Sequence, residues 1–164
     1  MEVKFIKNSV RDHILSCKRN DGTETWRHVS NFFIIHDICH YAAETVIPLN
    51  NAFFGMVAAG TDIENFDLPK EQRNFQLTEE AILAEHLVNL LTIEVTQGKL
   101  ENFLEVFSGI YEEHVGTKLY RLVTENKLEE IRNKITDLLQ QWNLLEETKT
   151  MTLLFKEALV KFIT

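Results

Sequence analysis

Apolar residues form short β-rich runs at the start of this chain and, over most of the rest, long segments with a helical period. The first thirty residues hold two β-rich runs, at 3–6 and 13–17, and Asn20-Asp21-Gly22 supplies a turn before 23–26. Over most of the chain after residue 31 the apolar positions recur with the period of a helix. A chain of 164 residues with two prolines and six glycines has few breaks, so its elements must be long. The sequence therefore predicts one α+β domain over 1–164, mostly helical, with a small N-terminal antiparallel meander.

Caps, breakers and apolar periodicity predict about four long helices, over 31–46, 78–96, 99–114 and 124–146. Ser30 or Asn31 can cap the first helix, and Pro48 follows its end. The last helix is amphipathic, so its apolar stripe docks on the domain or on a second copy of the chain. We therefore expect a homodimer, if one forms, to use the helix over 124–146.

Three shorter segments complete the expected fold. Residues 52–60 are apolar and small, which predicts a short buried helix or a tight crossing near the helix over 31–46. Residues 61–77 are polar and predict a long loop that covers that helix. The tail over 150–155 has the composition of a strand that could join the meander, although 156–162 can equally be helical.

The helix over 31–46 concentrates titratable side chains on one stripe. At about 100° per residue, His36, His40, Glu44 and Asp37 fall within an arc of about 100°, and small apolar residues occupy the opposite side. Imidazoles four residues apart on a helix can converge on one metal ion. The stripe therefore predicts a divalent-metal site.

Helix geometry limits which of these groups can share one ion. His36 and Glu44 are about 12 Å apart along the axis, whereas each is about 6 Å from His40. The expected ligands are His36 and His40, at Zn–N distances of about 2.0–2.1 Å, with at least one more from another element. Glu85 or His86, on the helix over 78–96, is the expected third ligand. Asp37 and Glu44 would then orient an imidazole or act as the base on a water molecule.

The other candidate side chains can each be explained by a structural role. Buried histidines are usually satisfied by hydrogen bonds, and Tyr41 is a neighbour that could provide one. Asp62 and Asp67 could contribute to the site from the loop, but acidic residues in turns more often cap the turn or face solvent. The remaining histidines are expected to carry no chemistry; they are His13, His28 and His114. Cys17 and Cys39 match no paired spacing and are expected to be reduced, with Cys39 in the core.

The run His36-Asp37-Ile38-Cys39-His40 resembles three metal-binding motifs. It is similar to the H-D-I-x-H segment of HD-domain metal phosphohydrolases, in which the adjacent His and Asp bind metal. It is also similar to the H-D-x-x-H opening of the zinc motif in the helical coenzyme-Q biosynthesis family, whose later Glu position is Ala52 here. The third likeness is to the zincin H-E-x-x-H, with Asp37 in place of the general-base Glu and Glu85 as a distant ligand.

Over most of its length the chain resembles small bacterial proteins of unassigned function. They join a β-hairpin to the run H-D-x-x-H-Y-x-x-E, followed by a segment like 53–60 and then Asp62-Ile63. This likeness implies no known reaction. It does imply that His36, Asp37, His40 and Glu44 act as one unit.

Charge and hydropathy argue against two classes of partner. The formal net charge is −8, and the basic residues are scattered, so no positive stripe is present to bind nucleic acid or an anionic membrane. No charged-then-apolar leader opens the chain, and no apolar run approaches the roughly 18 residues needed to cross a bilayer. We expect a cytoplasmic protein.

These observations predict a protein that binds zinc, nickel or ferrous iron. If it is an enzyme, water activated by the metal is the simplest chemistry, so the expected reaction class is hydrolysis, with no substrate indicated. The alternative is a non-catalytic interaction module, in which the stripe is a hydrogen-bonded polar seam and the helix over 124–146 is the dimerisation surface.

Overall fold

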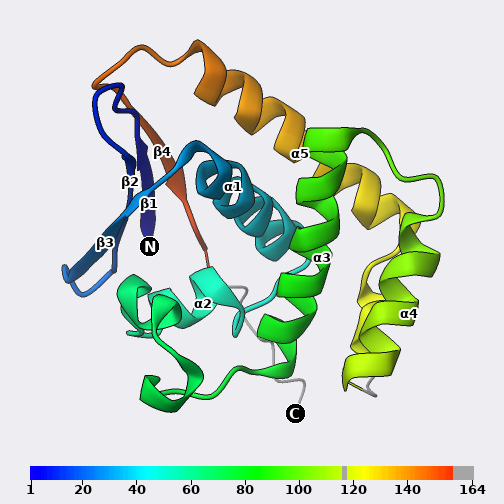
Figure 1. The fold of residues 1–164 in the computed structure, drawn as a ribbon. Coiled ribbons are helices and arrows are strands. Elements are labelled where there is room, and N and C mark those ends of the chain that lie inside the picture. Colours follow the sequence, from blue (N-terminus) through cyan, green and yellow to red (C-terminus); the bar gives the residue numbers. More distant parts are fainter. Residues whose placement is uncertain (116–117, 157–164) are drawn as a thin grey trace.

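The computed structural model describes residues 1–115 and 118–156, and of 112–115 the backbone only. Within these residues a four-stranded antiparallel sheet packs against five α-helices, so the predicted α+β class is confirmed (Figure 1). The strands and α-helices are β1 (Glu2–Ile6), β2 (His13–Lys18), β3 (Glu24–Val29), α1 (Asn31–Val46), α2 (Phe53–Ala58), α3 (Glu79–Gln97), α4 (Phe103–Val115), α5 (Glu125–Leu144) and β4 (Thr150–Leu154). Three short 3-10 helices are η1 (Ile63–Asp67), η2 (Lys70–Gln72) and η3 (Leu119–Leu122).

The sheet joins the two ends of the described chain. Its strand order is β3-β2-β1-β4, with every neighbouring pair antiparallel. Val3 on β1 lies opposite Cys17 on β2 and opposite Leu153 on β4. The predicted C-terminal strand is thus confirmed, while the alternative helix over 156–162 falls almost wholly outside the described residues. Alternate residues of β1 are buried because successive side chains of a strand point to opposite faces.

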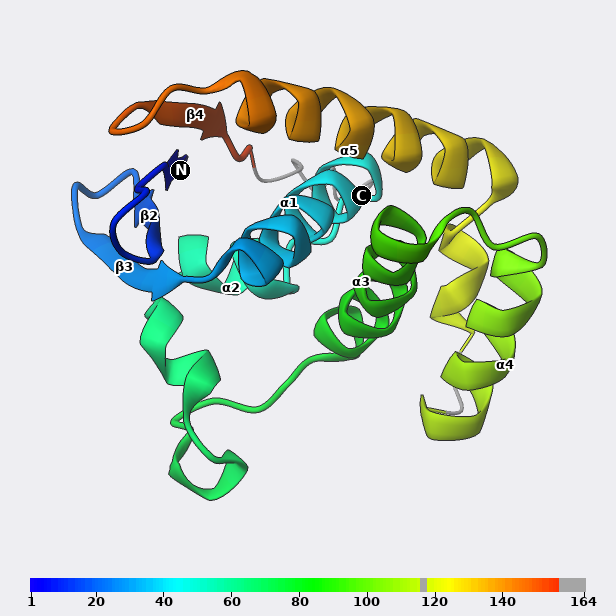
Figure 2. The same cartoon turned by 45° about the horizontal axis from the view of Figure 1, so that its top comes forward.

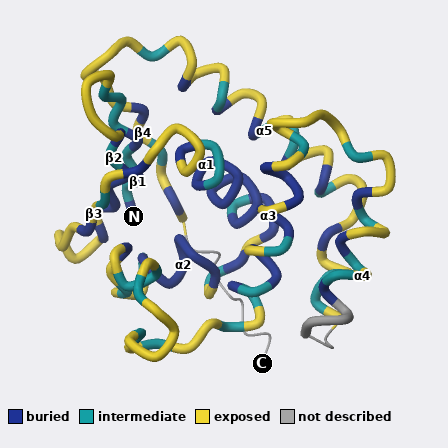
Figure 3. The backbone as a smooth tube through the Cα atoms, viewed as in Figure 1, coloured by how far each residue is buried: buried dark blue, intermediate teal, exposed yellow. Residues whose placement is uncertain are grey.

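Helix α1 lies in the middle of the molecule (Figures 1 and 3). It contacts α2, α3, α5 and two strands of the sheet. Two apolar clusters meet on it, one shared with the sheet and α2, the other with α3, α4 and α5. A helix enclosed in this way has little solvent-facing surface, so its polar side chains must find partners inside the protein.

The helix ends lie close to the predicted ones except at the start of α4, although Ser30, the N-cap residue of α1, makes no capping hydrogen bond with its side chain. Thr78 Oγ1 accepts a hydrogen bond from the Ala81 N–H at 3.0 Å and begins α3. Helix α4 begins at 103, so the prediction of a start at 99 was wrong. The Leu100 N–H donates to Glu94 Oε1 at 2.9 Å, which holds 98–102 in a turn after α3 instead of a further helical turn.

Helix α5 buries its apolar stripe within the chain. It runs over α1 from the sheet side to the α4 side (Figure 2). The stripe residues are at most 5% exposed: Leu128, Ile131, Ile135, Leu138 and Trp142. Of the two docking partners expected for this stripe, the structure provides the domain itself. A homodimer would have to use the opposite, polar face and stays a prediction.

The segment between α2 and α3 contains η1 and η2, and η1 contacts the edge strand β3. The Ile63 N–H donates to Thr25 Oγ1 of β3 at 3.0 Å, and the Ile63 side chain is fully buried. This anchor places 66–77 beside the N-terminal half of α1. Among the described residues, no helix is long and apolar enough to cross a membrane.

Candidate metal centre

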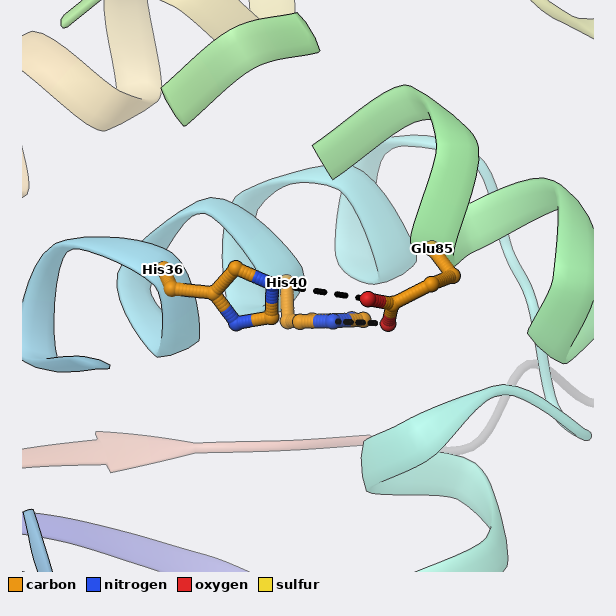
Figure 4. A group of neighbouring side chains, drawn as sticks. All are labelled: His36, His40 and Glu85. Atoms are coloured by element: carbon orange, nitrogen blue, oxygen red, sulfur yellow. Dashed lines mark ion pairs between the residues drawn. The ribbon is translucent and has the colours of Figure 1, made fainter. Parts of the chain in front are cut away.

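Three of the predicted ligands converge between α1 and α3. His36 and His40 project from α1, and Glu85 reaches them from α3 (Figure 4). Glu85 Oε1 lies 3.7 Å from His36 Nε2, and Glu85 Oε2 lies 3.3 Å from His40 Nε2. One ligand atom from each residue lies within 4.8 Å of the others. Tetrahedral zinc with ligand distances near 2.1 Å separates its ligands by about 3.4 Å, so small side-chain movements would bring all three to one ion.

Glu44 contacts the His40 ring at Nδ1, the nitrogen that faces away from Glu85. Glu44 Oε1 lies 3.0 Å from His40 Nδ1, and Glu44 Oε2 accepts a hydrogen bond from the Phe54 N–H at 2.8 Å. The carboxylate is fully buried and does not line the cavity described below. A carboxylate on Nδ1 places the ring proton there and leaves the Nε2 lone pair free for a metal. This position suits the orienting role expected for Glu44, whereas the role of base is less well supported because Glu44 does not line the cavity.

A close backbone approach at the start of α2 makes this arrangement possible. A Cβ atom on Gly55 would lie 2.1 Å from the Asn50 carbonyl oxygen, so only glycine fits without movement of the backbone. This approach places the start of α2 so that the Phe54 N–H donates to Glu44 Oε2 at 2.8 Å. The expectation that 52–60 packs near the site is confirmed, since the Phe53 ring also lies 5.5 Å from the His40 ring.

Asp37 and Arg27 form the neighbouring part of the site. Both oxygens of Asp37 lie 3.2 Å from Arg27 Nη2, and Asp37 Oδ1 lies 3.7 Å from His36 Nδ1. His36 Nδ1 is buried and has no hydrogen-bond partner in the described residues. The nearest carboxylate to that nitrogen is thus Asp37, at a distance too long for a hydrogen bond. A small rotation of the ring would give His36 the same carboxylate support that His40 has.

The pKa values of the cluster show how strongly its charges interact. Burial alone would lower the pKa of His40, but the Glu44 and Glu85 carboxylates outweigh it and raise the pKa to about 9. The pKa of His36 is also raised, because Asp37 and Glu85 outweigh its burial. The pKa of Glu85 is lowered because the His36 and His40 imidazoles lie 3.7 and 3.3 Å from its oxygens. Burial raises the pKa of Glu44, although His40 and two N–H groups oppose it. Without a metal, a proton on His40 offsets part of the negative charge of Glu44 and Glu85.

The three groups lie at a cavity of about 330 Å³. Its charged and imidazole side chains are Arg27, His36, Asp37, His40, Asp67, Arg73 and Glu85, and its apolar side chains are Phe33, Phe53, Phe66, Leu77 and Ala81. The segment 61–77, predicted to cover the stripe, supplies four of these residues. The Glu85 side chain is 55% exposed, so the cluster is open to the cavity and is not sealed in the core.

The other sequence candidates lie elsewhere. His86 follows Glu85 by about 100° around α3, and its ring lies 6.2 Å from the Tyr111 ring of α4, so the structure does not bring it to the cluster. Asp62 pairs with Arg19 at 2.8 Å, away from the cavity, whereas Asp67 pairs with Arg27 at its wall.

The remaining histidines and Cys39 also lie apart from the cluster. His13 bonds Asn31, and the His28 ring packs on Trp26. Cys39 is in the core. The side chain of His114 is outside the described part.

Two arginines of the cavity, Arg27 and Arg73, are not among the residues predicted from the sequence. Arg27 is on β3, where the alternation of buried and exposed residues turns Thr25, Arg27 and Val29 toward the helices. That period could have identified Arg27. Arg73 lies between η2 and α3, outside any periodic pattern, so no local signal could have placed it at this cavity.

Comparison of the chain with protein-family models, curated proteins and solved structures gives no match. The likenesses noted in the sequence therefore stay predictions.

Proposed function

We propose that this chain binds one divalent transition-metal ion, zinc in the first place and nickel or ferrous iron as alternatives, through His36, His40 and Glu85. The observation that carries the proposal is the position of Glu85, whose two oxygens face both Nε2 atoms while Glu44 takes the opposite nitrogen of His40. Two imidazoles and a carboxylate are a donor set that suits zinc, nickel and iron. Carboxylate support behind a ligating histidine is the usual companion of such a set.

We further propose hydrolysis as the reaction class. Three protein ligands leave a coordination position free, and the exposed side of Glu85 turns the cluster toward the cavity. A bound zinc ion supplies Lewis-acid chemistry and makes water more acidic. Asp37 lines the cavity and Glu44 does not, so Asp37 is the carboxylate placed to accept a proton. Arg27 contacts both oxygens of Asp37 and so keeps the carboxylate oriented.

The rival function is a structural polar seam in a protein that acts by binding a partner. It is favoured by the ion pairs themselves, because Glu85 and two protonated imidazoles satisfy one another without a metal. A seam of that kind needs no cavity above it. The opening of the cluster to a cavity of about 330 Å³ favours the metal site.

The test is elemental analysis of protein purified without a histidine tag. We expect about one zinc ion per chain in the wild type after loading and desalting. Three variants remove predicted ligands or control for them: His36→Ala/His40→Ala, Glu85→Ala and His86→Ala. The first two should lose the metal. The third should keep it, because His86 packs on Tyr111 instead of facing the cluster.

A further control is His28→Ala, which removes an exposed imidazole on β3. Circular dichroism would establish that each variant is folded. Stoichiometric zinc in the folded double variant would place the ion elsewhere and refute the site. A wild type that retains no metal, and whose thermal unfolding is unchanged by zinc or a chelator, would favour the polar seam. For the hydrolase, 4-nitrophenyl esters and phosphates are the probes, and equal turnover by Asp37→Asn would refute its role as base.

A further inference from the structure

One wall of the cavity carries a positive charge that no carboxylate of the described chain balances. Arg73 Nε donates to the Leu68 carbonyl at 2.8 Å, and Arg73 Nη2 donates to the Phe66 carbonyl at 3.0 Å. These two bonds fix the guanidinium in place through backbone atoms only. Its Nη1 group has no partner in the part of the chain that the structure describes, and it belongs to a side chain that lines the cavity.

Arg27, the other arginine of the cavity, is paired with carboxylates. Asp37 and Asp67 both form ion pairs with it, at 3.2 and 2.8 Å, so its charge is balanced within the protein. An arginine that is rigidly held yet unpaired with a carboxylate is suited to take an oxyanion, because its planar N–H groups match carboxylate and phosphate oxygens. Arg73 therefore differs from Arg27 in being free to pair with a ligand.

The charge of the whole lining agrees with an anionic ligand. Three carboxylates and two guanidinium groups line the cavity, together with His36 and His40. A divalent ion held by His36, His40 and Glu85 would give the lining one net positive charge, which attracts anions.

Apolar side chains form the rest of the cavity. The Phe53 and Phe66 rings lie 4.9 Å apart in an edge-to-face arrangement, and Phe33 and Leu77 line the cavity with them. A volume near 330 Å³ lies at the small end of the range for ligand sites, about 300–1,000 Å³. These walls suit a small molecule with a compact apolar or aromatic body.

We propose that this cavity binds a small organic oxyanion, a carboxylate or a phosphate monoester, whose apolar body packs on Phe53, Phe66 and Leu77 and whose charged group pairs with Arg73. The inference deepens the proposed metal function by naming the ligand class of the same cavity. It does not require the metal, because the Arg73 guanidinium is held at the cavity wall by the chain itself. Arg73 is the residue that determines specificity for the anion.

The experiment is isothermal titration of benzoate and of phenyl phosphate into the full chain, once metal-free and once loaded with zinc. Benzyl alcohol is the neutral control ligand, and we expect it to bind at least tenfold more weakly than either anion. Arg73→Gln should weaken anion binding at least tenfold, while Arg11→Gln, which removes an exposed arginine of the β1–β2 loop, should leave it unchanged. The ratio of the benzoate and phenyl phosphate affinities decides which acid group is preferred.

Arg73→Gln also removes two hydrogen bonds to backbone carbonyl groups, so this variant could fail to fold. Two variants of Leu77 test the anion site without that change. Leu77 is 47% exposed and lines the cavity, so Leu77→Asp and Leu77→Asn should both fold. Only the Asp variant adds a negative charge, and it should weaken anion binding at least fivefold relative to the Asn variant. Equal binding by the two variants would overturn the inference.

The two proposals can fail separately. Zinc binding that depends on His36 and His40, with no anion binding in either form of the protein, would refute the anion site alone. Anion binding that depends on Arg73 in a chain that does not retain zinc would support the anion site and refute the metal centre. Arg73→Gln should not change the zinc affinity, and a measured loss of zinc in that variant would count against the separate role assigned to Arg73.

Discussion

Replacement of Glu44 by glutamine tests the centre at its most buried polar contact. The Glu44 carboxylate accepts at both oxygens, with His40 Nδ1 at 3.0 Å on one and the Phe54 N–H at 2.8 Å on the other. A glutamine amide has one accepting oxygen, and its NH₂ group can only donate. One of the two contacts must therefore be lost in Glu44→Gln, although the side-chain volume hardly changes.

Either loss has a predictable effect. If the amide oxygen keeps the Phe54 N–H, the NH₂ group faces His40 Nδ1 and drives the ring proton to Nε2, the atom that the metal needs. Zinc binding should then weaken about 10–100-fold, or about 1.4–2.7 kcal/mol. If the oxygen turns to His40 instead, a buried N–H at the start of α2 loses its acceptor, at about 1–3 kcal/mol of folding free energy.

Competition with a chromophoric zinc chelator at constant pH measures the first effect, and chemical denaturation of the metal-free protein measures the second. Glu101→Gln, on the exposed turn before α4, is the matched control and should match the wild type in both assays. A folded Glu44→Gln with wild-type zinc affinity and wild-type stability would refute the role of Glu44 as the group that orients His40.

Four further predictions concern the metal-free cluster and its support. Because the pKa of His40 is raised from 6.5 to about 9, the stability that its proton contributes is complete below pH 6.5 and lost as the pH rises through 9, which thermal unfolding of metal-free protein would follow. Over that range zinc affinity should rise by about tenfold per pH unit, as long as binding displaces one proton, and a flat profile would contradict this. Gly55→Ala should destabilise the fold and weaken zinc binding together, because its Cβ meets the Asn50 carbonyl oxygen at 2.1 Å; a folded variant with unchanged affinity would contradict the packing argument. Leu87→Ala, at a fully buried core position, should cost about 2–5 kcal/mol by denaturation, with zinc affinity unchanged in the remaining folded protein.

Much of the fold could be predicted because its signals are local. Strand alternation over the first thirty residues and the helical period after residue 31 both repeat within a few residues of the chain, so the sequence displays them directly. Thr78 as a cap and Gly98 as a stop were readable for the same reason. The late start of α4 was not, because it depends on the Glu94 side chain bonding Leu100 after the helix has ended.

The site residues also fall into those that local periodicity could place and those that it could not. His36, Asp37, His40 and Glu44 share one helical stripe by geometry alone, so the sequence by itself determined half of the centre. The choice of Glu85 over His86 depended on how α3 is rotated against α1, and Arg27 and Arg73 come to the cavity from segments far apart in the chain. Sequence periodicity carries no information on such contacts, because the packing of one element on another is decided by the whole core at once. Only the tertiary structure could decide which charges face each other across the cavity.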